Sequence, residues 1–312
     1  MSRGKRSGAD RKRYGIGEWY GKPITSLSAK QRQKFGAIGS GYSGLPCPFR
    51  KAAMPKAICN KKGGVCTLRT HVESDGGVSL SGPLVTVCPS RFWMKNDVFR
   101  WIGERMIGTA KPTIIKEVEF LKSIGGEPSE EESPESAAVG RIDTVLMNPR
   151  DAENWCALEI QAVYFSGRKM SSHLGQYASA PTVPVFPDAV RRPDWRSSGP
   201  KRLMPQLQTK VPTLRRWGRK MAVLIDRPFF DSLGPMVEVQ HLSNCDIVWF
   251  VVDYRFDTQE IQRDRVIMTT LESSVDALTA GVPSSKEEFE TRLGVAIANA
   301  GPSNRTKVIK VR

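Results

Sequence analysis

Acidic side chains stand on two expected strands, where together they could hold a divalent cation. In residues 155–164 a period of two places Glu159 and Gln161 on one face, opposite an apolar face. Asp143 lies in a second apolar strand, residues 141–147, and a short turn lets the two strands pair. Carboxylates on adjacent strands form a hard oxygen site suited to Mg²⁺, which can generate hydroxide and stabilise charge on a phosphate.

A third carboxylate comes from further upstream. Glu117 lies in an expected strand, residues 113–121, and is our choice for the additional acidic residue. Glu119 on the same strand and Glu104 on an expected helix are its rivals. All of these acids could instead decorate a solvent-facing sheet surface, because such spacings also arise by accident.

Four cysteines form a second group that could bind metal. Cys47, Cys59, Cys66 and Cys88 fall within 42 residues of loop-rich sequence with little apolar content. Tetrahedral thiolate sites accept zinc or iron, and zinc is the default. The spacing lacks a C-x-x-C pair, so scattered cysteines remain an alternative, as does His71 in place of one thiolate.

The remaining two cysteines, Cys156 and Cys245, lie on apolar strand faces and are expected in the core.

Positive charge gathers in two segments of the 312-residue chain, whose net charge is +15. Residues 1–36 and residues 188–220 each carry ten basic and two acidic side chains, so each contributes +8. The rest of the chain is near neutral. Concentrated charge of this kind indicates phosphate contacts, although a basic tail and a solvated helix face would also account for it.

The second basic segment mixes arginines, hydroxyl groups, an acid and turn residues. Such a loop suits the reading of base edges, since arginine pairs with guanine and aspartate accepts from cytosine. Trp195 could stack on DNA or anchor the core. The residues expected to contact DNA are Arg191, Arg192, Asp194, Arg196, Lys201 and Arg202.

Helical and strand periodicities alternate along the chain, which predicts an α/β fold with a central mixed sheet flanked by helices. Gly108 is a stop signal for the first helix. Helices are expected at residues 96–108, 213–222 and 287–300, and strands at 113–121, 141–147, 155–164, 221–226 and 245–254.

Three regions are expected: a basic N-terminal arm at 1–39, a metal-binding region at 40–95 and a catalytic domain at 96–312. An acidic, low-complexity stretch at 125–138 reads as a solvated connection. No apolar run approaches the roughly 18 residues that span a bilayer. Six cysteines are too few for a secreted disulfide scaffold, so we expect a reducing cytoplasm.

Three features in this order resemble a known family. Asp143 followed by Glu159-x-Gln161 is similar to the PD-(D/E)xK nuclease core, with glutamine in place of lysine. The cysteine segment with Cys47-Pro48-Phe49, and the later Arg-Arg-Pro-Asp-Trp-Arg-Ser-Ser-Gly-Pro-Lys-Arg, resemble the NotI family of type II restriction endonucleases. The resemblance covers roughly residues 40–255.

The resemblance implies a homodimer that cleaves double-stranded DNA at a palindromic, GC-rich site with Mg²⁺. Asp143 and Glu159 would be metal ligands and Gln161 would take the lysine position. Glutamine carries no charge and cannot act as a base, so it could only orient water or ligate through its carbonyl oxygen. The four cysteines would bind a structural iron, with zinc as the alternative, in a loop that docks on DNA far from the chemistry.

Two other functions explain part of the sequence. A non-catalytic, metal-stabilised DNA-binding protein accounts for the charge and the cysteines, but gives Asp143, Glu159 and Gln161 no role. An RNA-binding protein is disfavoured because only 8% of residues are aromatic and no base-stacking motif occurs.

Overall fold

A computed structural model describes residues 13–74, 77–122, 138–167, 170–179, 191–279, 284–299 and 308–309. The acidic stretch at 125–137 and the first twelve residues of the expected basic arm lie outside these ranges. The chain divides into two units, Met1–Thr279 and Ala280–Arg312. The described part of the second unit contains one helix, α8 (Lys286–Ala298), which Ser285 and Glu288 begin with a reciprocal capping box.

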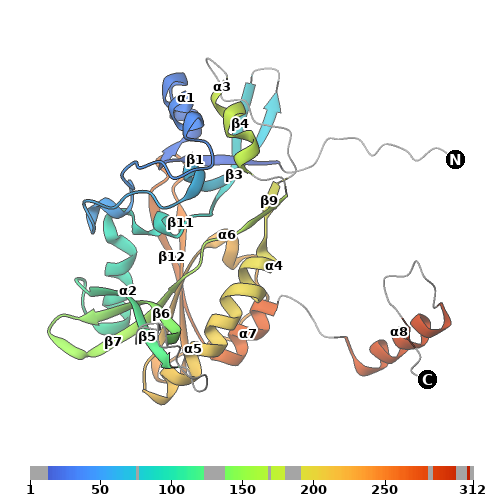
Figure 1. The fold of residues 1–312 in the computed structure, drawn as a ribbon. Helices are drawn as coiled ribbons and strands as arrows, with labels where there is room; N and C mark the ends of the chain where they lie inside the picture. Colours follow the sequence, from blue (N-terminus) through green and yellow to red (C-terminus); the bar gives the residue numbers. More distant parts are fainter. Residues whose placement is uncertain are drawn as a thin grey trace, which may run out of the picture. The chain divides into compact units, whose positions relative to one another are not determined.

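The first unit contains a small antiparallel sheet near its N-terminus (Figure 1). Helix α1 (Ala29–Ile38) begins at Ser28, whose hydroxyl accepts from the backbone of Gln31, and it buries Phe35. The strands of this sheet, in spatial order, are β2 (Lys22–Pro23), β1 (Arg13–Trp19), β3 (Val65–Ser74) and β4 (Gly77–Thr86).

The larger sheet has six strands, and it is mixed. Strand β10 runs parallel to both of its neighbours, and the other pairs are antiparallel. In spatial order the strands are β12 (Ile261–Thr269), β11 (Ile247–Tyr254), β10 (Met221–Asp226), β7 (Asp151–Ile160), β6 (Ala138–Asn148) and β5 (Thr113–Lys122).

Helices cover both faces of this sheet, as the alternating periodicities predict. Helix α2 (Asp97–Ile107) packs Val98, Phe99 and Ile102 into one apolar cluster with Leu158, and Gly108 ends it with a φ of 68°. Helix α5 (Met204–Arg216) packs its apolar stripe into the other cluster, which also contains Leu278 of helix α7 (Leu271–Thr279). The predicted α/β fold with a mixed sheet and flanking helices is confirmed.

Smaller elements follow β7 and β10 in the chain. They are β8 (Phe165–Gly167), α3 (Leu174–Ser179), β9 (Arg191–Pro193), α4 (Trp195–Ser198) and α6 (Arg227–Phe230), and β8 and β9 pair as a separate two-stranded sheet. No helix among the described residues is long and apolar enough to cross a membrane.

The structure differs from the sequence expectation in three places. The strand expected at 155–164 ends at Ile160, because Val163 turns away and donates its N–H to the Thr86 carbonyl of the first sheet. Most of 191–220 is helical rather than a loop. Residues 13–38 of the expected arm are folded: they form β1 and β2 of the first sheet, where Ile16 and Trp19 are fully buried, and then α1.

Buried polar groups join the two sheets. Arg91, which precedes α2, donates to Glu18 of β1 at 2.7 Å, and both side chains are almost fully buried. The rings of Phe49 and Tyr254 cover the Arg91 guanidinium. The Thr86 N–H donates to Asp226 at 2.6 Å. These contacts fix the first sheet against the end of the second.

We expect Arg91→Met to lower the free energy of unfolding by about 3–5 kcal/mol, because it leaves the Glu18 carboxylate buried without its partner. The double variant Glu18→Leu/Arg91→Met should recover much of that loss. Denaturant unfolding measures both. Lys95→Met, which removes the exposed Lys95–Glu260 pair, is the control and should change little. Equal losses in the single and double Arg91 variants would contradict the pairing argument.

Candidate functional site

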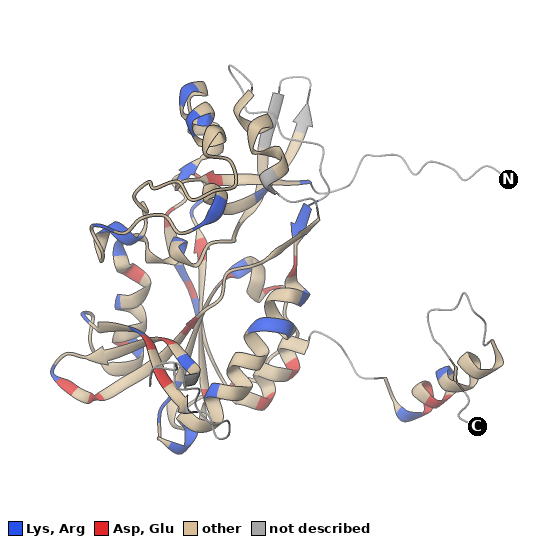
Figure 2. Cartoon of the chain, in the orientation of Figure 1, with Lys and Arg blue, Asp and Glu red and all other residues tan. Residues whose placement is uncertain are grey.

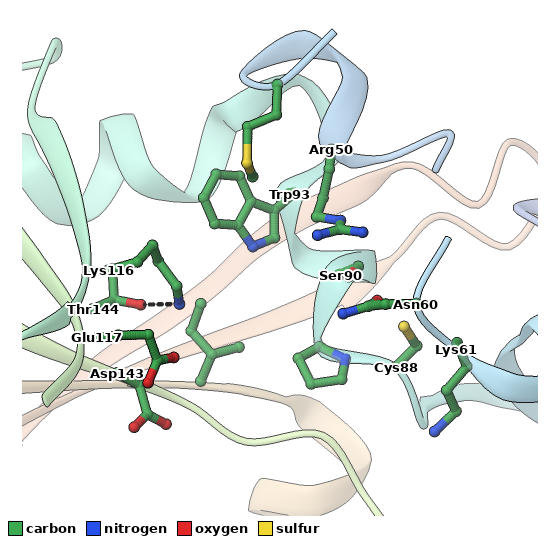
Figure 3. A pocket seen from close by; sticks show the side chains of 13 residues that line it. Arg50, Asn60, Lys61, Cys88, Ser90, Trp93, Lys116, Glu117, Asp143 and Thr144 are labelled. Carbon is green, nitrogen blue, oxygen red and sulfur yellow. Dashed lines mark hydrogen bonds between the residues drawn. The ribbon is translucent and has the colours of Figure 1, made fainter. Parts of the chain in front are cut away.

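Three carboxylates form a row across strands β5, β6 and β7. Thr144 pairs with Leu158, so the next residues, Asp143 and Glu159, lie side by side where this pairing ends. The pairs on either side of Glu117 place it across from Asp143. Both of these side chains reach the same cavity (Figure 3). Asp143 and Glu159, which fifteen residues separate in the sequence, are therefore neighbours in the fold.

The backbone at Glu117 is strained. Its φ is 56°, in the left-handed region that a residue with a side chain rarely adopts within a strand. Such a conformation costs about 1–3 kcal/mol and persists only where its surroundings impose it. Strain of this kind gathers at functional sites, which supports a role for Glu117.

The rival acids lie elsewhere. Glu119 pairs with Arg141 at 3.2 Å, and Glu104 of α2 pairs with Arg263 at 3.5 Å. All four side chains are about half exposed, and none lines the cavities around Asp143. Of the three candidates, Glu117 alone lies beside Asp143.

Lys210 of α5 lies between the two central carboxylates. Its ammonium donates to Glu159 at 2.8 Å and to Asp143 at 3.3 Å. The Lys210 side chain is 2% exposed and that of Glu159 is 6% exposed, whereas that of Asp143 is 48% exposed. Glu159 and Lys210 are thus held within the protein, and Asp143 presents its carboxylate to the cavity.

Burial is the main reason why the pKa of Glu159 is raised to about 7. The negative charge of Asp143 also raises this pKa, and the Lys210 ammonium opposes both. A cation placed at the two carboxylates would favour their ionised forms.

Gln161 follows directly on the end of β7. Its backbone N–H still donates to Leu224 of β10 at 3.1 Å, and its side-chain amide donates to the Ala162 carbonyl at 2.5 Å. The side chain lines the same cavity as Asp143 and Glu159. Gln161 is therefore near the carboxylates, but the ammonium that donates to Asp143 and Glu159 is that of Lys210.

Lys210 is the residue that the sequence argument missed. The sequence placed it only among the ten basic residues of 188–220 and gave it no role of its own. The sequence feature that could have identified Lys210 is its position on the apolar stripe of a helix, between Leu207 and Val211, which are both buried. A lysine on such a stripe needs a buried partner.

Two adjoining cavities, of about 470 and 310 Å³, share Asp143 and Lys61. One wall comes from β5, β6 and β7, and the other from the segment that carries the cysteines (Figure 3). Cys88 itself lines the larger cavity. The sequence placed the cysteine loop far from the chemistry, whereas it faces the carboxylates.

The four cysteines gather in one place. Cys47 and Cys59 lie on neighbouring extended segments, where the Pro46–Ile58 bridge joins them, and the Cys88 N–H donates to the Cys66 carbonyl at 3.2 Å. All four are buried. Burial raises the pKa of the Cys59 and Cys66 thiols, and in both the charge of Cys88 adds to this. The four thiols therefore lie within electrostatic reach of one another.

The sulfur atoms do not form a closed metal site. Within the described ranges, no group of three or more His, Cys, Asp or Glu side chains is arranged to hold a metal ion. Cys156 and Cys245 are buried in the apolar cluster beneath α2, as expected of core residues.

The residues expected to contact DNA fall into two groups. Arg191 is buried against His173. Asp194 accepts from the hydroxyl and the N–H of Ser197 at the start of α4, and these hydrogen bonds lower the pKa of Asp194. Trp195 stacks on Phe229 at 6.0 Å, which favours the core anchor over stacking on DNA. The exposed group comprises Arg192, Arg196, Lys201 and Arg202. Figure 2 colours the Lys and Arg positions of the chain blue.

Arg202 connects this exposed group to the site. Its guanidinium lies over the ring of Tyr164, 3.9 Å from the centroid, and Tyr164 lines the smaller cavity. Arg202 and Tyr164 thus connect the smaller cavity to the exposed basic residues.

A comparison with protein-family models matches residues 38–265 to the family described as restriction endonuclease NotI. A search of the curated proteins finds no match. The matched region includes the cysteine segment, the carboxylate row, Lys210, five strands of the larger sheet and the first half of the sixth, β12. The chain therefore belongs to the NotI family of restriction endonucleases.

Proposed function

We propose that this restriction endonuclease hydrolyses DNA with Mg²⁺ at the carboxylate row, within a PD-(D/E)xK core. The observation that carries the proposal is the placement of Asp143 and Glu159 side by side on adjacent strands, tied together by one buried lysine. Helices on both faces of a mixed sheet agree with that core.

The donor set suits Mg²⁺. This ion binds through one or two carboxylates and keeps several water or phosphate oxygens as further ligands, so it does not need three protein side chains. Asp143 and Glu159 would hold it, with Glu117 as the additional acid. When bound, Mg²⁺ supplies an activated water and neutralises charge on the phosphate.

Lys210 would supply the positive charge that Gln161 lacks. Its ammonium favours the ionised form of Glu159 against the effect of burial and links this carboxylate to Asp143, in a place from which bulk water is excluded. Gln161, which lines the smaller cavity, would orient a water or ligate through its carbonyl oxygen. Lys210 would thus provide the positive charge and Gln161 would orient the water, two roles that a single lysine could fill in other sites.

The four cysteines would bind iron, with zinc as the alternative. Four buried thiols that affect one another electrostatically are a donor set that either metal accepts. A metal there would hold the segment 40–95 together, which has few regular elements before β3. Its role would be structural.

DNA recognition would use the exposed residues Arg192, Arg196, Lys201 and Arg202. A palindromic, GC-rich target fits arginine-rich readout and a homodimer, because two-fold protein symmetry matches two-fold DNA symmetry. Asp194 and Arg191 would position this surface rather than read bases.

With Mg²⁺ and a long GC-rich DNA, the purified protein should give discrete bands on a gel, and EDTA should prevent them. Asp143→Asn should reduce cleavage about a thousandfold, because a metal ligand loses its charge, while DNA binding persists. Glu119→Gln, on the neighbouring strand, is the control and should cut normally. DNA that is bound but never cut by the wild type would favour a non-catalytic binding protein.

We expect Lys210→Met to slow cleavage about a hundredfold, because the carboxylates lose their shared cation. Adding Gln161→Lys should restore part of the rate, since it returns a positive charge to the same carboxylates. Single-turnover cleavage measures both, and circular dichroism checks the fold. Normal cleavage by a folded Lys210→Met variant would contradict the role given to Lys210.

Elemental analysis of the purified chain should find about one iron or zinc ion per molecule. Cys66→Ser should carry far less, because it removes one thiolate, whereas Cys245→Ser should keep the metal. A wild-type chain without iron or zinc, after growth with both metals supplied, would refute the proposed centre.

A further inference from the structure

The larger cavity has two walls that differ in charge. On the first wall, formed by β5 and β6, the carboxylates of Glu117 and Asp143 outnumber the one ammonium beside them, that of Lys116. Arg50, Asn60 and Lys61 lie on the opposite wall, and all three come from the cysteine segment (Figure 3). A cation would lie against the first wall and an anion against the second.

Arg50 has an unused hydrogen-bond donor. Its guanidinium donates to the Ile58 carbonyl, which fixes the side chain in place. Its Nε atom is buried and has no hydrogen-bond partner among the described residues. Because a buried donor without an acceptor costs about 1–3 kcal/mol, an acceptor brought to Arg50 by a ligand would be favourable.

Lys61 is placed between the two cavities. Its ammonium donates to the Val87 carbonyl at 2.6 Å, and it lines both cavities together with Asp143. An ammonium has three hydrogens, so one bond to Val87 leaves capacity for a ligand. Exposed Asn60, directly before it, adds an amide that both donates and accepts.

We propose that Arg50, Asn60 and Lys61 bind a backbone phosphate of the cleaved DNA strand, beside the phosphate that lies over Asp143. This inference rests on the proposed function of the carboxylate row. The chemistry of the wall is that of phosphate contacts, which combine arginine, lysine and amide donors. Two adjoining cavities that share Asp143 and Lys61 accommodate a continuous strand rather than a single small anion.

The cysteine segment is therefore part of the catalytic cleft. Cys59 directly precedes Asn60 and Lys61, and Cys47 lies three residues before Arg50. Cys88 lines the cavity itself. The contacts that hold the four cysteines in place therefore also set the distance between the phosphate-binding wall and the carboxylates.

DNA binding without cleavage tests the proposal, in the Asp143→Asn background. Lys61→Ala and Arg50→Ala should each weaken binding about tenfold, and each should reduce the salt dependence by about one phosphate contact. Asn60→Asp should also weaken binding by repelling the phosphate. Because Asn60 is exposed, this variant tests the wall without disturbing the core.

Lys51→Ala and Lys56→Ala are the matched controls, because both lysines are exposed on the same segment and line neither cavity. They should bind within about twofold of the parent. Equal losses in the controls, or no change in Lys61→Ala, Arg50→Ala and Asn60→Asp, would overturn the proposal.

The two proposals fail in different ways. If the wild type cuts DNA but the wall variants bind and cut normally at every salt concentration, the phosphate site alone is refuted. If the wild type never cuts DNA while the wall variants lose affinity, the catalytic proposal fails and the phosphate site stands.

Discussion

The ammonium of Lys210 lies 2.8 Å from Glu159 and 3.3 Å from Asp143, and much of the surrounding fold holds it there. Burying a carboxylate or an ammonium alone is very costly, whereas burying them together is feasible if their geometry is kept. Helix α5 keeps it by packing Leu207, Val211 and Leu214, all at most 1% exposed, against the sheet. The position of the helix and that of the charge are thus set by the same contacts.

The cavity lies where the two sheets are joined. After Ile160 the chain leaves β7, and Val163 bonds to Thr86 at the end of β4. The Thr86 N–H in turn bonds to Asp226 at the end of β10. Lys61 is tied to Val87, the next residue, so the cysteine segment faces Asp143 because of the same junction. The basic wall could not face the carboxylates unless the first sheet were fixed to the second.

Periodicity was sufficient to predict the central part of this arrangement. Apolar alternation located β5, β6, β7, β10 and β11, and the turn before β7 paired Asp143 with Glu159. Periodicity alone could not show whether Glu117 or Glu119 lies beside Asp143, because a period of two places both on one face of the strand. Strand register and the unusual φ of Glu117 distinguish the two residues, since the register places Glu117 across from Asp143 and Glu119 across from Arg141.

The motif Glu159-x-Gln161 could not predict that the ammonium of Lys210 contacts the carboxylates. A motif records residues that are close in sequence, but a carboxylate responds to whichever cation is close in space. Gln161 stands two residues from Glu159 and carries no charge, while Lys210 stands 51 residues away and touches it. A helix packed over the strand can supply the cation as well as the strand itself. The better sequence signal is a lysine on the apolar stripe of a helix, because its burial requires an acidic partner in the sheet beneath.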